Sequence, residues 1–251
     1  MTGHVIVTDS DGIRTIRMNR PEKRNALTSA MYDAMAGALE NANTSEFVRC
    51  VIIAGVPGAF SAGNDLVDFL AAMLSAADGL DFGALRFLAA LIRCSKPVIA
   101  AVGGVAVGIG TTMLLHCDFV VAGTDARFST PFVSLGLVPE GASSLLLPQL
   151  FGRRRAFEFL VMDHALNAME ARELGLANRV VAPEEIELEA LKAAREIAAL
   201  PPDAVRQSRR LMVSGTEEVL AQLEREAAVF RERLRSPEAK AALEAFFARK
   251  R

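Results

Sequence analysis

The chain has 251 residues, of which 51% are hydrophobic and 23% are charged, and its 28 basic and 30 acidic side chains leave a formal net charge of −2. A chain this apolar and this close to neutral is not a disordered protein, and it lacks the positive excess of a basic nucleic-acid-binding protein. Its length suits one large domain, or one domain with an appendage, and is sufficient to bury a sizeable core.

The first half of the chain alternates short apolar strands with amphipathic helices. Residues 5–7 and 13–18 alternate apolar and polar side chains around Asp11-Gly12, which predicts a β-hairpin. The next predicted elements are a helix, a strand, a helix and two strands, over residues 27–39, 51–54, 85–92, 98–102 and 119–122. This alternation predicts an α/β core with a mostly parallel sheet.

Strand signals end near residue 184, and the rest of the chain is predicted to be helical. Apolar side chains recur at helical spacing at Val219, Leu223, Ala227, Phe230 and Leu234. Ser236-Pro237-Glu238 has the order expected at a helix start, with a cap, a proline and then an acid. We therefore divide the chain into a core of residues 1–195 and a C-terminal helical region of residues 196–251.

Residues 97–117 carry no charge and are numerous enough to span a bilayer. Four glycines interrupt this run, at Gly103, Gly104, Gly108 and Gly110. A buried strand, a glycine turn and a helix that begins at Thr111 explain it better than a membrane span. Because the N-terminus also has no basic, apolar leader, we expect a cytoplasmic protein without a membrane segment.

Side chains that often bind metals or act as nucleophiles give no recognisable site. The three cysteines, Cys50, Cys94 and Cys117, have neither a disulfide framework nor metal-ligand spacing, so we expect reduced thiols and no metal. Ser61 lies in a near miss to a nucleophile elbow. The histidines are isolated in the sequence, which favours structural or surface roles for His4, His116 and His164.

Two glycine-containing turns each follow a buried strand and open a helix. They are residues 60–66 (FSAGNDL) and residues 107–110 (VGIG). Helix N-termini carry unpaired backbone N–H groups and the positive end of the helix dipole. Side by side, two such turns can aim two N–H groups at one oxygen and form an oxyanion hole. Taken separately, each turn is better explained as an ordinary connection between a strand and a helix.

Together with their neighbours, these turns resemble the crotonase superfamily, the enoyl-CoA hydratase/isomerase family. The matching segments occur in the family's order at residues 19–27 (NRPEKRNAL), 60–69 (FSAGNDLVDF), 96–118, 126–141 (ARFSTPFVSLGLVPEG) and 245–250 (AFFARK). The resemblance implies an α/β fold with a crotonase-like ββα spiral core and a helical C-terminal trimerisation region. It also implies a homotrimer or a dimer of trimers, and an acyl-CoA substrate without a further cofactor.

The resemblance also implies which residues form the site. The oxyanion-hole donors are the backbone N–H groups of Asn64 and Ile109. The residues that line the CoA and acyl site are Arg24, Ala26, Leu27, Ala62, Asp65, Leu66, Gly108, Pro131, Phe132 and Leu135. The segment that shapes the acyl pocket is residues 67–82, which are rich in alanine.

Carboxylates separate the activities of this family. Family hydratases use two glutamates to hold a water and move its proton, and the matching positions here are Thr112 and Phe132. One acid does lie nearby, Glu140 in the segment VPEG, and it resembles the single catalytic glutamate of the peroxisomal type of 3,2-enoyl-CoA isomerase. Without the resemblance, Glu140 would be interpreted as a surface acid before a helix.

The isomerase branch implies a reaction with one base, in which Glu140 moves a proton from C2 to C4 of a 3-enoyl-CoA. Three apolar side chains, Phe132, Leu135 and Leu137, are expected to form a wall that excludes water and raises the pKa of Glu140. Two alternatives stay open: a hydratase or another crotonase-fold enzyme, and a non-catalytic acyl-CoA-binding relative. An RNA-binding relative is the least favoured, because the chain is nearly neutral.

Overall fold

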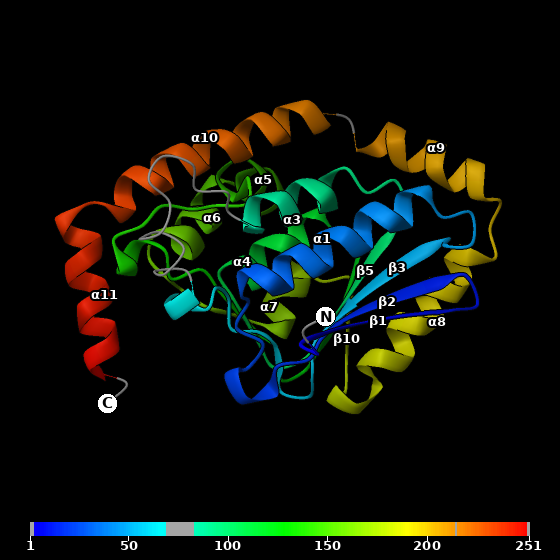
Figure 1. Cartoon of the computed structure of the whole chain (residues 1–251), viewed down its shortest axis with the longest axis horizontal. Coiled ribbons are helices and arrows are strands. Elements are labelled where there is room, and N and C mark those ends of the chain that lie inside the picture. The colour runs from blue at the N-terminus through cyan, green and yellow to red at the C-terminus, as the bar shows by residue number, and fades with distance from the viewer. Residues whose placement is uncertain (1–2, 69–82, 214, 250–251) are drawn as a thin grey trace.

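Two β-sheets form the centre of the computed structural model, which describes residues 3–68, 83–213 and 215–249 (Figure 1). Within these residues the larger sheet contains β1 (Val5–Ser10), β2 (Ile13–Met18), β3 (Cys50–Ala54), β5 (Val98–Val102), β7 (Phe119–Gly123) and β10 (Arg179–Val181), in that order. The smaller sheet contains β4 (Ala59–Ser61), β6 (Val105–Val107), β8 (Arg127–Ser129) and β9 (Leu166–Asn167), in that order. Neighbouring strands are parallel except in the pairs β1–β2 and β8–β9, which confirms a mostly parallel core.

The hairpin predicted at the N-terminus is confirmed as β1 and β2. Ser10 pairs with Ile13, and the two residues between them, Asp11 and Gly12, both have positive φ, at 53° and 76°. Two-residue hairpin turns with positive φ at both positions match the twist of the strands that they join. The pairing extends three residues beyond the predicted first strand, to Ser10.

The chain visits the two sheets in turn. Strands β3, β5 and β7 of the larger sheet are followed by β4, β6 and β8 of the smaller one. After β4 the chain becomes helical at residues 66–68, and after β6 it enters α4 (Ile109–Thr112). This succession of strand, strand and helix confirms the predicted ββα spiral.

The larger sheet separates two apolar layers. Val51 and Ile53 of β3 face the layer that contains α1 (Ser29–Thr44) and α3 (Gly83–Ile92). The alternate residues of β3 belong to a second cluster with α8 (Ile186–Ala198), on the opposite face of the sheet (Figure 1). Because both faces are covered, the central strands are continuously apolar, as the sequence pattern predicted.

The remaining helices connect or follow the sheets. The α-helices are α5 (Ser143–Phe151), α6 (Arg153–Leu160), α7 (Ala168–Glu173), α9 (Pro202–Met212), α10 (Thr216–Leu234) and α11 (Pro237–Arg249). The 3-10 helices are η1 (Pro21–Lys23), η2 (Met113–His116), η3 (Val133–Leu135) and η4 (Pro183–Glu185). In Figure 1, α10 runs along the top of the molecule above α3, and α11 turns down beside it.

Two predicted helix boundaries are wrong, each for a local reason. The helix expected over residues 27–39 is α1, which begins at Ser29, because the Thr28 hydroxyl caps it by accepting a hydrogen bond from the Met31 N–H at 3.4 Å. The helix expected from Thr111 begins two residues earlier, at Ile109, because Gly108 adopts a φ of 55° and ends the strand there.

The uncharged run of residues 97–117 is divided among β5, β6, α4 and η2. Among the described residues, no helix combines the length and the apolar character needed to cross a membrane. The three cysteines are unpaired, with Cys50 and Cys94 buried and Cys117 half-buried. The strand and the turn predicted for this run are confirmed, and the predicted helix is present but begins two residues earlier, at Ile109.

The C-terminal part of the chain is helical, as predicted. The last strand is β10, and α8, α9, α10 and α11 follow it. The predicted boundary at residue 195 lies inside α8, whose first residues pack against the larger sheet. The division of the chain at that residue stays a prediction.

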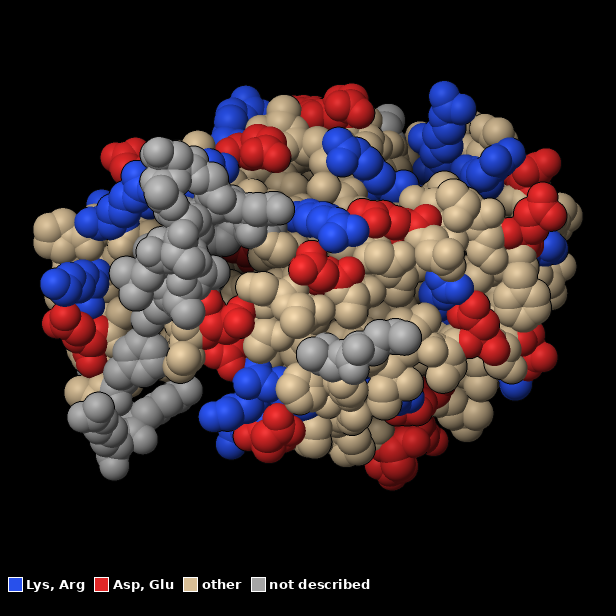
Figure 2. Space-filling view, viewed as in Figure 1, with Lys and Arg blue, Asp and Glu red and all other residues tan. Residues whose placement is uncertain are grey.

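The surface carries charges of both signs. Figure 2 shows basic and acidic side chains interspersed over one face of the molecule. Several of them form ion pairs across elements, as in the contacts of Arg86 with Asp33 at 3.2 Å and with Glu40 at 2.9 Å. On this face the described residues form no broad positive area of the kind that binds nucleic acid.

Candidate active site

The two glycine turns lie side by side in the structure. Strand β4 pairs in parallel with β6, so the turns that follow them leave the smaller sheet together. A Cβ atom on Gly63 would lie 2.7 Å from the carbonyl oxygen of Val107, and Gly63 has a φ of 85°. Only glycine permits this backbone conformation and this approach without strain. The sequence prediction that the two turns are adjacent is therefore confirmed.

Each turn contains a backbone N–H group, that of Asn64 or Ile109, that has no partner among the described residues. Leu27 N–H donates to Gly63 O at 2.8 Å, and Asp65 N–H donates to Leu27 O at 2.9 Å, so Asn64 lies between two bonded residues. Ile109 begins α4, where N–H groups have no intrahelical acceptor. No hydrogen bond within the described part of the chain uses the N–H of Asn64 or Ile109. Both groups thus lack a partner within the described residues, as the predicted oxyanion hole requires.

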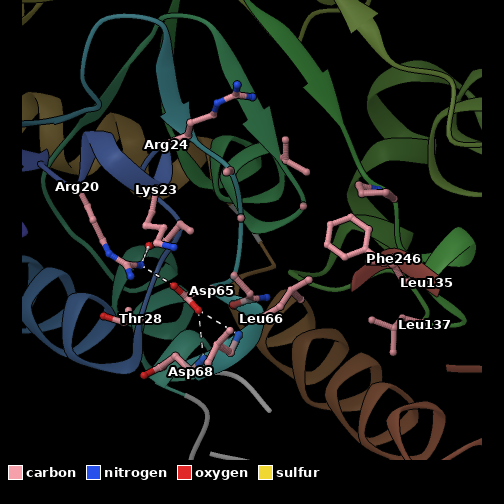
Figure 3. A pocket seen from close by; sticks show the side chains of 18 of the residues that line it. Arg20, Lys23, Arg24, Thr28, Asp65, Leu66, Asp68, Leu135, Leu137 and Phe246 are labelled. Atoms are coloured by element: carbon pink, nitrogen blue, oxygen red, sulfur yellow. Dashed lines mark hydrogen bonds and ion pairs between the residues drawn. The ribbon is translucent and has the colours of Figure 1, made fainter. Parts of the chain in front are cut away.

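A groove of about 1090 Å³ opens beside these turns. Most residues predicted to line the CoA and acyl site do line it, namely Arg24, Ala26, Ala62, Asp65, Leu66, Gly108, Pro131, Phe132 and Leu135. In Figure 3 the basic side chains Arg20, Lys23 and Arg24 lie along one wall, and Leu135, Leu137 and Phe246 lie along the other. The groove thus has one wall suited to anionic groups and one suited to an apolar chain.

Leu27 was predicted to line the site, but the structure places its side chain elsewhere. Its bridge to Asn64 turns the side chain into the core, where it is only 1% exposed. Leu27 therefore serves the site through its backbone, which holds the residues on both sides of Asn64. Ile109 likewise has a buried side chain and can contribute only its N–H group.

Asp65 has a structural task within the groove. Its Oδ2 accepts a hydrogen bond from Arg20 Nη1 at 2.7 Å, and its Oδ1 accepts from the N–H groups of Val67 and Asp68. Burial alone would raise the pKa of Asp65, but these hydrogen bonds outweigh burial and hold the pKa below its ordinary value. The carboxylate thereby caps the helical turn that follows Asn64, the residue predicted to form part of the oxyanion hole.

Glu140 lies in a second, smaller cavity of about 40 Å³. Asn64 and Phe230 line both this cavity and the groove, so the cavity that contains Glu140 adjoins the groove. Glu140 is half-buried rather than a surface acid. Burial raises its pKa to about 8; a hydrogen bond from Thr112 opposes that rise, and the charge of Glu226 adds to it. Such a carboxyl group can both accept and return a proton near neutral pH.

The apolar surroundings of Glu140 differ from the prediction. Phe132, Leu135 and Leu137 line the groove and do not line the cavity that Glu140 shares. That cavity is lined instead by Ala84, Leu85 and Leu88 of α3 and by Leu223, Ala227 and Phe230 of α10. The wall comes from two helices whose contact could not be inferred from the local sequence around Glu140.

Thr112, which the family resemblance matches to a hydratase glutamate, makes a contact of its own with Glu140. Its hydroxyl donates to Glu140 Oε1 at 2.5 Å, and no described residue donates to Oε2. A Cβ atom on Gly141, whose φ is 74°, would lie 2.9 Å from this hydroxyl oxygen. The glycine after Glu140 therefore allows the close approach of Thr112, which leaves one carboxylate oxygen available for chemistry.

Sequence reasoning missed two further polar residues near the site. The Tyr32 hydroxyl donates to Asn64 Oδ1 at 2.6 Å, and burial, followed by the charges of Glu140 and Asp68, raises the pKa of Tyr32. Glu226 on α10 is 6% exposed and binds the backbone just after Glu140. The sequence did contain a signal for Glu226, because this acid lies beside the apolar stripe, three residues after Leu223.

His116 is structural, as the sequence favoured. Its Nε2 lies 2.9 Å from Gly141 O and donates to it. Burial lowers the pKa of His116 to about 4, although the bond to Gly141 opposes this shift.

Most of the segment predicted to shape the acyl pocket, residues 69–82, lies outside the described residues.

Comparison with known proteins gives a consistent result. The model of the enoyl-CoA hydratase/isomerase family matches residues 8–251. The chain is 36% identical over 250 residues to enoyl-CoA delta isomerase 2 of Rattus norvegicus, with 98% of this chain but only 64% of the rat protein covered. The chain thus spans less than two thirds of that relative's length.

Two further similarities cover nearly the whole of both chains. The chain is 30% identical to a probable enoyl-CoA hydratase of Rhizobium meliloti (strain 1021), with 100% of this chain and 98% of that protein covered. It is 40% identical to the crystal structure of an enoyl-CoA hydratase/isomerase from Pseudoalteromonas atlantica T6c, with a TM-score of 0.92 over 98% of this chain and 97% of that one.

Proposed function

The chain belongs to the enoyl-CoA hydratase/isomerase, or crotonase, family of acyl-CoA enzymes, and from this premise we propose that it isomerises 3-enoyl-CoA to 2-trans-enoyl-CoA. The observation that carries the proposal is the single carboxyl group of Glu140, held by Thr112 beside the cavity that Asn64 also lines. The two hydratase positions hold Thr112 and Phe132, neither of which can activate a water as a base.

In the proposed reaction, the thioester carbonyl binds the N–H groups of Asn64 and Ile109. Glu140 Oε2 removes a proton from C2, and the electrons of the C2–H bond form a dienolate that extends from the carbonyl oxygen to C4. The two N–H groups stabilise the oxyanion, and each such donor typically contributes about 3 kcal/mol to the transition state. Glu140 then returns the proton at C4, which restores the carbonyl and leaves a double bond between C2 and C3.

The groove supports a CoA thioester as the ligand. Arg20 is paired with Asp65, but Lys23 and Arg24 on the same wall make no ion pair among the described residues (Figure 3). Basic side chains of this kind bind phosphate groups through charge-assisted hydrogen bonds. The opposite, apolar wall at Leu135, Leu137 and Phe246 suits the pantetheine and acyl portions. The ligand is itself the substrate, and the proposed steps need no further cofactor.

The proposal is tested by incubating the protein with 3-hexenoyl-CoA in ordinary and in deuterated water and identifying the products. From 3-hexenoyl-CoA, the wild type is expected to give 2-trans-hexenoyl-CoA. In a separate incubation with 2-trans-hexenoyl-CoA, it is expected to form little of the hydration product, 3-hydroxyhexanoyl-CoA. Glu140→Gln is expected to retain acyl-CoA binding and to lose at least 100-fold in kcat, on the order expected when a general base is removed. Glu224→Gln, an exposed change on α10, is the control.

Three results would contradict the proposal. Glu140→Gln with more than a few per cent of wild-type activity would exclude Glu140 as the base. Efficient hydration would favour a hydratase that uses other acids. Tight binding of acyl-CoA without any exchange of the C2 proton into deuterated water would favour a non-catalytic binding protein.

A further inference from the structure

Glu226 is a buried carboxylate that the proposed reaction does not use. It lies on α10, is 6% exposed, and comes from a part of the chain more than 80 residues from the segment that it contacts. A buried carboxylate is costly unless strong donors compensate it. The identity of these donors shows what the residue accomplishes.

Three hydrogen-bond donors outside α10 bind the Glu226 carboxylate, and all three belong to the segment after Glu140. Ala142 N–H donates to Oε2 at 2.7 Å, Ser144 N–H donates to Oε1 at 2.9 Å, and the Ser144 hydroxyl also donates to Oε1. Ala142 has a φ of 57° and precedes α5, where no side chain of its own provides a cap. Glu226 thus supplies from α10 the cap that α5 lacks, and it satisfies N–H groups that would otherwise be unpaired.

The segment that carries Glu140 is held at three consecutive residues. Thr112 donates to the Glu140 side chain, His116 donates to Gly141 O, and Glu226 accepts from Ala142 N–H. The first two donors come from α4 and η2, and the third partner comes from α10. Because α10 also lines the cavity through Leu223, Ala227 and Phe230, one helix fixes both the wall and the backbone at this site.

We propose that Glu226 is a positioning residue for Glu140, which it aligns through the backbone of residues 142–144. The carboxylate of Glu226 also acts on Glu140 electrostatically, as a second acid bound to the same segment. The proposal rests on the proposed function in taking Glu140 as the base. Glu226 does not line the cavity, so its effect reaches the reacting carboxyl group only through this backbone and through space.

The electrostatic part of the proposal involves few other groups. Thr112 contacts the Glu140 carboxyl group directly, and His116, whose pKa is lowered by burial, contacts the next residue, Gly141. The charges of Glu140 and Asp68 both raise the pKa of Tyr32. On Glu226 itself, burial raises the pKa, while bonds from Ser144 and Ala142 and the nearby Gln222 oppose the rise. Glu226 is thus the acidic neighbour that opposes ionisation of Glu140.

The test compares Glu226→Gln with Glu224→Gln, which removes the same charge from an exposed position of α10. A glutamine can accept only one of the two backbone bonds, so hydrogen–deuterium exchange of the peptide that contains residues 142–146 is expected to accelerate roughly 10-fold or more. The apparent pKa of Glu140, followed by carbon NMR of labelled glutamate, is expected to fall. For the isomerase reaction we expect kcat to fall roughly 10- to 100-fold with KM nearly unchanged.

The exchange and NMR measurements decide the proposal without any catalytic activity. Unchanged exchange at residues 142–146, or an unchanged Glu140 pKa, in Glu226→Gln would overturn it. If the wild type proves inactive toward 3-enoyl-CoA, the proposed function fails while these two measurements still show whether Glu226 positions Glu140. Should Glu226→Gln not fold, Glu226→Asp, which keeps the charge but shortens the reach, is expected to accelerate exchange while leaving the Glu140 pKa raised.

Discussion

At the scale of single residues, the site depends on how one carboxyl group is held. Burial raises the pKa of Glu140 to about 8, and the hydroxyl of Thr112 counteracts this by stabilising the ionised form. The family resemblance matches Thr112 to one of the two hydratase glutamates, so this position lacks that acid and instead gives Glu140 a hydrogen-bond donor. A carboxyl group that must accept and then return the same proton benefits from such a balance.

Thr112→Val is expected to disturb this balance while keeping nearly the same shape. Loss of the hydrogen bond removes the contribution that lowers the Glu140 pKa, so the acid limb of the kcat/KM profile should move to higher pH. Activity at pH 7 is expected to fall roughly 10-fold, because a Glu140 pKa raised by one unit leaves about a tenth as much of the carboxyl group ionised. Thr112→Ser retains a hydroxyl and is expected to behave like the wild type. A profile of Thr112→Val that is unshifted, or shifted to lower pH, would contradict the role given to Thr112.

The parts of the candidate site that depend on backbone conformation could be predicted from the sequence. The two turns could be recognised because glycines at Gly63 and Gly108 permit backbone conformations that other residues resist. Glu226 and Tyr32 could not be placed, because their contacts join segments that are distant in the chain and leave no local spacing. Leu27 shows the converse limit, since a matched position does not reveal which way its side chain points.

At the scale of elements, strands were easier to predict than helix ends. β3, β5 and β7 are buried on both faces, so their continuous apolar runs stand out in the sequence. The start of α4 depends instead on a glycine conformation that only the packing of two turns requires. The short strands of the smaller sheet, such as β9 with its two residues, carry too little pattern to be predicted.

Helix α9 lies at the surface and contacts the rest of this chain through Arg209, which binds Asp118 at 2.8 Å. It has no buried residues, and Leu211 and Met212 at its end are 80% and 82% exposed. We propose that the homotrimer or dimer of trimers implied by the family resemblance uses this apolar end as one of its contacts. Exposed apolar side chains that lie together are typical of association surfaces.

Replacing both Leu211 and Met212 with glutamate is expected to weaken a contact between copies of the chain at α9, because it places like charges in an apolar interface. Light scattering should give the mass of three or six chains for the wild type and a lower mass for the double variant Leu211→Glu, Met212→Glu. Leu188→Glu, on the exposed side of α8, is the control and should leave the mass unchanged. A wild-type mass of a single chain would exclude the assembly, and an unchanged mass in the double variant would exclude α9 from the contact.

At the scale of the whole molecule, two half-buried titratable groups give the stability opposite dependences on pH. Glu140 has a pKa of about 8 against an ordinary 4.5, so its contribution is present below pH 4.5 and is lost as the pH rises through 8. His116 has a pKa of about 4 against an ordinary 6.5, so its contribution is present above pH 6.5 and is lost as the pH falls through 4. Between pH 4.5 and 6.5 the two slopes nearly cancel.

Comparing the wild type with Glu140→Gln separates these contributions, because all other groups cancel in the difference. From pH 4.5 to 8 the free energy of unfolding of the variant should rise relative to the wild type by about 1.4 kcal/mol per pH unit. His116→Gln, which can still donate to Gly141 O, should gain relative to the wild type only as the pH falls below 6.5. Urea unfolding at half-unit pH intervals measures both differences. If the Glu140→Gln difference does not change between pH 5 and 8, then Glu140 is not held in the neutral form by its burial, and its role as a base that titrates near neutral pH is excluded.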